Sequence, residues 1–239
     1  MQREVLLVVG GVLLYFGGRG LTESDPGPAR EHAQDLVALE RALGLFWEPW
    51  LQGLVDGSHA VVTVANWIYI WGHWPVIILT LVWLVVRHPA QYRRTRNAMA
   101  VSGAIGMVVF VLYPVAPPRL VDLGLVDTVT LHSEAYRVLQ PPAFSNLYAA
   151  MPSLHVGWNL LMGIAIASAA RHWLLRSVGY ALPVLMAASV VLTANHFLVD
   201  VVAGAFVALL GLVIATTLER RRGALRADTG HALEGATER

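Results

Sequence analysis

The chain is 239 residues long, and 56% of its residues are hydrophobic while only 14% are charged. Soluble domains have about 45 to 50% apolar and about 25% charged residues, so this composition indicates an integral membrane protein. The formal net charge is +1, which lacks the strong basic excess typical of nucleic-acid-binding proteins. The chain has no cysteine, so thiol catalysis, disulfides and cysteine metal sites are excluded.

Six apolar segments predict six membrane-spanning helices. Crossing about 30 Å of hydrocarbon at about 1.5 Å per residue takes about 20 residues. Four segments approach or exceed this length, at residues 60–86, 98–113, 173–194 and 197–218. Two are shorter, at residues 5–16 and 156–170. The expected fold class is an all-α integral membrane protein with six transmembrane helices and an extracytoplasmic amphipathic helix.

Three local signals refine these spans. Residues 5–16 have the length of a signal-peptide core, but no A-x-A cleavage pattern follows, so we interpret them as a retained first span. Pro75 is expected to kink the second span, because proline lacks the backbone N–H that a helix needs. The helix at 156–170 is expected to begin within the sequence MPSLH, with Pro152 in its first turn.

Arginine placement predicts the orientation in the membrane. Three regions are rich in arginine: the connector 87–97, the turn 171–176 and the tail after residue 218. By the positive-inside rule they lie in the cytoplasm, and both termini with them. Residues 17–59, residues 114–151 and the turn near Asn195 then face outward. We expect a plasma membrane of bacterial type and an active site on its extracytoplasmic side.

One membrane domain is expected, at residues 1–222. Its parts are a first span and linker (1–28), an interfacial amphipathic helix (29–59) and a catalytic core (60–218), followed by a disordered cytoplasmic tail (223–239). The amphipathic helix is predicted from apolar side chains spaced three to four residues apart, namely Leu36, Leu39, Leu43, Phe46 and Trp50. A packing lid without chemistry is the expected role of such a stripe.

Ionisable side chains within the spans are the first candidates for function, because each costs about 2.5 to 3.5 kcal/mol at mid-bilayer. His196 and Asp200 open the last span four residues apart, which places both on one face of the helix. The carboxylate can accept a hydrogen bond from one imidazole nitrogen and leave the other nitrogen free to attack a substrate or to bind a metal.

Two further clusters are expected at the same membrane face. Ser153 and His155 lie at the outer start of the fourth span, where the unpaired N–H groups of a new helix can bind an anion. Arg119 follows the proline-rich exit of the third span, and its planar guanidinium can hold a phosphate with two parallel hydrogen bonds. Each residue alone has an ordinary structural explanation. Together they form a set suited to phosphoryl transfer.

The two histidine motifs resemble those of the type 2 phosphatidic acid phosphatase superfamily. The resemblance is carried by Pro152-Ser153-Leu154-His155 and by His196-x-x-x-Asp200, with Gly204 four residues further on. A narrower likeness to the inositol phosphorylceramide synthase-like (Aur-type) group and its bacterial relatives rests on the sequence YPVAPPR ending at Arg119, on Leu154, and on Asn66, Tyr69 and His73. The similarity extends from about Asn66 to Gly204.

This resemblance implies a two-step reaction without metal or other cofactor. His196 would attack phosphorus and form a phosphohistidine, with Asp200 orienting the imidazole. His155 would protonate the leaving alkoxide and later deprotonate the incoming water or alcohol. Ser153 and Arg119 would hold the phosphoryl oxygens as charge develops. Three more side chains are expected near the substrate cavity, namely Tyr69, His73 and Asn195.

The chain departs from the superfamily pattern at two positions that normally carry cations. Leu112 stands where the first motif has a lysine, and the chain contains no lysine. Val190, after Ser189, stands where the third motif has an arginine. Arg137, in the long external loop, is the candidate replacement for one of these cations, with a solvated loop charge as the equal alternative.

Several alternatives stay open at this stage. The substrate can be phosphatidic acid, a polyprenyl phosphate or another phospholipid, and the acceptor can be water or an alcohol such as inositol. The sequence therefore does not separate a lipid phosphatase from a phosphotransferase. His155, His196 and Asp200 could instead ligate zinc in a membrane hydrolase. A lipid transporter or scaffold without enzymatic activity would use the polar cluster for binding only.

Overall fold

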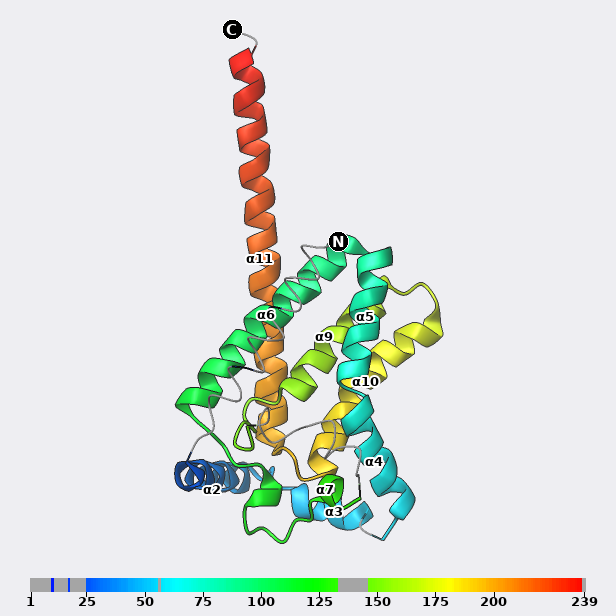
Figure 1. Ribbon diagram of the computed structural model, residues 1–239, viewed down its shortest axis with the longest axis vertical. Helices are drawn as coiled ribbons and strands as arrows, with labels where there is room; N and C mark the ends of the chain where they lie inside the picture. Colours follow the sequence, from blue (N-terminus) through cyan, green and yellow to red (C-terminus); the bar gives the residue numbers. More distant parts are fainter. Residues whose placement is uncertain (1–9, 11–16, 18–24, 56, 133–145, 238–239) are drawn as a thin grey trace.

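The computed structural model describes residues 25–55, 57–132 and 146–237, together with Gly10 and Gly17. Within this part of the chain the regular structure is helical (Figure 1), apart from one isolated bridge between Val115 and Ala149. The helices are α2 (Pro26–Leu43), α3 (Glu48–Val55), α4 (His59–Trp71), α5 (Trp74–Arg87), α6 (Pro89–Leu112), α7 (Thr128–His132), α9 (Leu154–Ala169), α10 (Trp173–Leu192) and α11 (Leu198–Thr237), with the 3-10 turn η1 (Pro118–Leu120).

Three of the described helices are long and apolar enough to cross a membrane, namely α6, α10 and the Leu198–Arg222 part of α11. The pair α4 and α5 makes a fourth candidate if it counts as one span, and α9 is apolar but shorter. The described part of the chain is therefore helical, with three to four candidate membrane spans, as expected for an integral membrane protein. The first predicted span, at residues 5–16, lies outside the described residues apart from Gly10.

The second predicted span consists of two helices. α4 ends at Trp71 and α5 begins at Trp74, with a bend of 47° between them. Pro75 lies in the first turn of α5, where the missing N–H of proline has no intrahelical partner to lose. The break falls at Gly72 and His73, and it leaves the His73 side chain buried.

α9 begins within the sequence MPSLH as predicted, but the predicted place of Pro152 is wrong. Pro152 does not lie in the first turn, because the helix begins at Leu154 with Ser153 as its N-cap. The Ser153 hydroxyl accepts a hydrogen bond from the N–H of Val156 at 3.5 Å. A serine that satisfies one of the free N–H groups fixes the helix start after itself, and this places the proline before the cap.

The predicted single helix at 29–59 is wrong in two respects. It is interrupted at Gly44, which closes α2 in the left-handed conformation at φ 68°, so α3 is a separate helix. The buried face also differs, since it consists of Ala29, Ala33, Leu36, Val37 and Glu40. Leu39, Leu43 and Trp50 of the predicted stripe are 45%, 60% and 62% exposed. Small side chains allow α2 to pack closely, and apolar side chains that face lipid need no burial in the protein.

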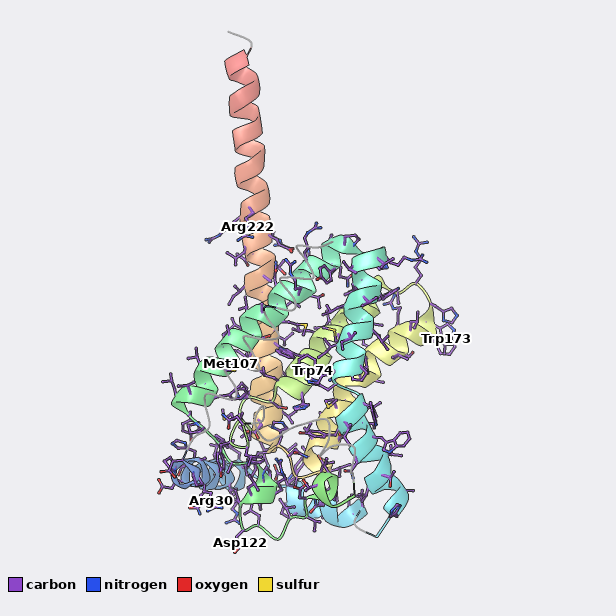
Figure 2. The ribbon with its side chains drawn as sticks, in the orientation of Figure 1. Arg30, Trp74, Met107, Asp122, Trp173 and Arg222 are labelled. Carbon is purple, nitrogen blue, oxygen red and sulfur yellow. The ribbon has the colours of Figure 1, made fainter. Side chains whose placement is uncertain are left out.

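α2, α3 and α7 lie across one end of the helix bundle, where α11 begins (Figure 1). Figure 2 shows Arg222 of α11 far from this end, while Arg30 and Asp122 lie at it. The arginine-rich ends of α6 and α11 are joined by an ion pair between Arg94 and Glu219 at 3.3 Å. α11 continues as a helix to Thr237, through the segment predicted as a disordered tail, where no proline or glycine pair interrupts it.

Candidate active site

The first turns of α9 and α11 are in direct contact. The backbone N–H of Ser153 donates to the carbonyl of Asp200 at 3.0 Å. Gly204 makes this approach possible, because a Cβ at its position would lie 2.1 Å from the carbonyl oxygen of Ser153. Gly157 faces Gly204 in turn, with 2.6 Å between its built Cβ and the Gly204 carbonyl oxygen. This glycine contact brings the two histidine motifs together.

His196 lies just before α11, which begins at Leu198, and it faces Asp200 on the first turn of that helix. Nδ1 of His196 lies 3.5 Å from Oδ2 of Asp200, and both side chains are buried. Oδ2 also accepts a hydrogen bond from the N–H of Phe197 at 2.9 Å, which fixes the carboxylate. An aspartate at Nδ1 favours the tautomer with its proton there and leaves Nε2 as the nitrogen with a free lone pair.

His155 lies between His196 and two aromatic side chains from the α4–α5 region. Its ring centroid is 5.8 Å from that of His196, with an angle of 57° between the rings. Tyr69 stacks on His155 at 4.9 Å, and His73 lies 4.3 Å from it. The structure therefore brings together one ring from the start of α9 and one from the segment that precedes α11.

Asn159 connects His73 to His155. Its side-chain amide donates to the backbone carbonyl of His155 at 3.0 Å and lies 3.3 Å from Nδ1 of His73. Because an NH₂ group can only donate, a hydrogen bond between these two groups requires Nδ1 of His73 to be the acceptor. Tyr69 and His73, both predicted near the cavity, thus surround His155. Asn159 was missed, although its spacing of four residues from His155 could have indicated it.

Arg119 holds the turn that precedes His196. Its backbone N–H donates to the carbonyl of Ala194 at 3.0 Å, and Nη1 of its guanidinium donates to Oδ1 of Asn195. Ala194 has a φ of 53°, a conformation that costs about 1 to 2 kcal/mol outside glycine. Nε of Arg119 also pairs with Asp127 at 3.2 Å. These side-chain contacts use two of the five N–H groups of the guanidinium.

The remaining predicted residues differ in their placement. Asn195 is buried and donates to Thr193, so Asn195 and Arg119 both support the turn. Ser189 donates to the carbonyl of Ala65 at 2.9 Å and joins α10 to α4. Arg137 lies outside the described residues.

The described side chains bear on the zinc alternative. No group of three or more histidine, aspartate or glutamate side chains in the described ranges has the arrangement of a metal site.

Glu40 and Glu48 are fully buried beside the first turn of α11. Their position could not be predicted, because charged residues between apolar ones on an amphipathic segment usually face water.

Comparison with known families gives one match. A sequence profile described as the PAP2 superfamily matches residues 34–214, about three quarters of the chain. The match includes α3 to α10 and both histidine motifs. No curated protein and no solved structure matches the chain. The chain belongs to the PAP2 superfamily.

Proposed function

We propose that this protein transfers a phosphoryl group, or a phosphate-linked headgroup, from a membrane lipid through a phosphohistidine on His196. The observation that carries the proposal is the approach of the His155 and His196 rings to 5.8 Å, with Asp200 behind Nδ1 of His196. Superfamily membership supports a phosphatase or phosphotransferase acting on lipid phosphates.

The reaction has two steps. In the first, the Nε2 lone pair of His196 forms a bond to phosphorus, the bond from phosphorus to the leaving oxygen breaks, and protonated His155 gives its proton to that oxygen. In the second, neutral His155 takes a proton from water or an alcohol, whose oxygen bonds to phosphorus while the bond to His196 breaks. Both histidines then have their initial protonation states.

Arg119 and the first turn of α9 supply the positive charge that the phosphoryl oxygens require. The guanidinium of Arg119 retains N–H groups beyond those used for Asn195 and Asp127, and a guanidinium can bind two phosphoryl oxygens at once. The α9 N-terminus at Ser153 adds the partial charge of a helix end. Charge stabilisation of this kind is usually the largest contribution to such reactions.

An alcohol is the acceptor that we favour over water. The side chains behind the narrower resemblance to the inositol phosphorylceramide synthase-like group include Tyr69 and His73. Both lie against His155, the residue that would deprotonate the acceptor. An acceptor hydroxyl bound near these rings would receive the phosphoryl group in place of water.

For the lipid tail we propose an apolar groove on α4. The groove has a volume of about 590 Å³ and runs along α4, with Trp67, Ile68, Trp71 and Gly72 in its lining. The arginine-rich ends of the helices lie away from this site, which supports an active site on the extracytoplasmic side of a plasma membrane.

The test uses purified protein and a ³²P-labelled phospholipid in vesicles, with and without inositol or a lipid alcohol. A new labelled lipid that needs the alcohol supports transfer, while labelled phosphate or phosphomonoester supports hydrolysis. Failure of a folded protein to cleave any labelled lipid phosphate would contradict the proposal and favour a transporter or scaffold. Activity that persists after chelation would support the reaction without metal, and loss that zinc restores would support a zinc hydrolase.

A further inference from the structure

Two buried glutamates from the predicted lid contact the first turn of α11. Oε1 of Glu40 in α2 accepts a hydrogen bond from the N–H of Val199 at 2.7 Å. Oε1 of Glu48 in α3 accepts one from the N–H of Leu198 at 2.8 Å. Both residues are fully buried, and neither has a part in the reaction described above. The two N–H groups that they bind belong to residues that closely follow His196 in the chain.

Three carboxylates therefore satisfy three successive N–H groups at the start of α11, because Asp200 accepts from Phe197. The first N–H groups of a helix have no intrahelical partner and carry about half of a positive charge in total. Three ionised carboxylates would carry far more negative charge than this partial positive charge can offset. Two ionised carboxylates side by side in a buried site repel each other strongly, so one of them retains a proton.

The second oxygens of the two glutamates indicate where that proton lies. Oε2 of Glu40 and Oε2 of Glu48 are buried, and no other described group donates to them. Burial, followed by the neighbouring carboxyl of Glu48 and the charges of Glu48 and Asp200, raises the pKa of Glu40 to about 8 against the opposing effect of the Val199 N–H. Glu48 from α3 and Asp200 from α11 are the charged groups that face Glu40.

We propose that Glu40 and Glu48 are positioning residues for His196, and that they hold the first turn of α11 as a carboxyl–carboxylate pair with one shared proton. The inference rests on the proposed function, since it concerns the ring that would attack phosphorus. His196 immediately precedes the turn that the pair holds, and Asp200 is part of it. A displaced turn would therefore change the distance of Nδ1 from Asp200 and the approach of the ring to His155.

The test compares Glu40→Gln and Glu40→Ala with Glu31→Gln, a control on the exposed face of α2. Glutamine can accept from Val199 and donate to Glu48, as the protonated acid does. We expect Glu40→Gln to keep kcat within about threefold at neutral pH, and Glu40→Ala to lower kcat by about tenfold or more with little change in KM. Above pH 8 the wild type should lose activity more steeply than Glu40→Gln.

Two measurements do not depend on turnover. Infrared spectra of the wild type at neutral pH should contain the C=O band of a buried protonated carboxyl that Glu40→Gln lacks and Glu31→Gln retains. The ¹⁵N resonances of the His196 ring, assigned by their loss in His196→Ala, should shift in Glu40→Ala and not in Glu31→Gln. If the protein transfers no phosphate, these two results still decide the inference separately from the proposed function.

Absence of the carboxyl band in the wild type would contradict the shared proton. Unchanged His196 resonances in Glu40→Ala would contradict the positioning role, as would equal loss of kcat in Glu40→Gln and Glu40→Ala. If the alanine variant does not fold, Glu48→Gln replaces it in the spectra. Removing the neighbouring charge should then lower the pH at which the Glu40 band disappears, and an unchanged pH would contradict the pair.

Discussion

The N–H of Ser153 donates to the carbonyl oxygen of Asp200 at 3.0 Å, so the backbone itself joins the two histidine motifs. This contact requires close packing of α9 on α11 at Gly204. The distance between His155 and His196 therefore depends on a residue without a side chain.

Gly204→Ala should separate the two helices. The added Cβ would meet the Ser153 carbonyl oxygen at 2.1 Å, and backbone cannot move away as a flexible side chain can. We expect a loss of about 3 kcal/mol or more in the free energy of unfolding. Thermal unfolding in detergent measures it. Gly53→Ala on α3, where a Cβ meets nothing within 4 Å, is the control and should be neutral or slightly stabilising.

Arg119→Lys should behave like Arg119→Ala. A lysine carries the charge but cannot pair with Asp127 and Asn195 while also binding two phosphoryl oxygens. Both variants should lower kcat/KM by about 100-fold or more, measured by release or transfer of labelled phosphate. Arg30→Ala, exposed on α2, should have no effect. Near-normal activity of the lysine variant would contradict bidentate binding.

Asn159→Leu and His73→Gln should lower kcat by related amounts, because both remove the connection from His73 through the Asn159 amide to His155. In a double-mutant cycle the two losses should not add, and the coupling should exceed about 0.5 kcal/mol. The measurement is kcat for the two single variants and the double variant. Fully additive effects would mean that the two residues act on His155 independently or not at all.

Stability should depend on pH through Glu40. Its pKa is raised from 4.5 to about 8 in the folded protein, so the folded state keeps a proton that the unfolded chain has released. The stabilisation is complete below about pH 4.5 and is lost as pH rises to about 8. The apparent Tm of the wild type should fall by several degrees more over this interval than that of Glu40→Gln. Parallel curves for the two proteins would contradict the raised pKa.

The histidine motifs could be predicted from the sequence because their geometry is largely local. The short spacing of His196 and Asp200 keeps the two side chains within reach of each other, although the predicted common helix face is wrong because α11 begins only at Leu198. The apolar segments around both motifs predict helices that start at one end. The resemblance to the PAP2 superfamily rests on the same residues, and the matching profile confirms it at the level of the superfamily.

Other parts of the site depend on contacts between distant segments. Glu40 meets Val199 across 159 positions of the sequence, and no periodicity predicts that a carboxylate on an amphipathic helix will cap a helix elsewhere. Asp127 likewise has no local signal for its pairing with Arg119. The start of α9 could have been predicted more accurately, since Ser153 is a better N-cap than the residues around it.

The most direct measurement is to trap the covalent intermediate. Purified protein is mixed with a ³²P-labelled lipid phosphate, quenched in denaturant and separated, and the protein-bound label is tested at acid and alkaline pH. We expect label that is acid-labile, alkali-stable and absent in His196→Ala. His59→Ala, altered at an exposed histidine of α4, should retain it. Full turnover or full labelling in His196→Ala would contradict the assignment of His196 as the nucleophile.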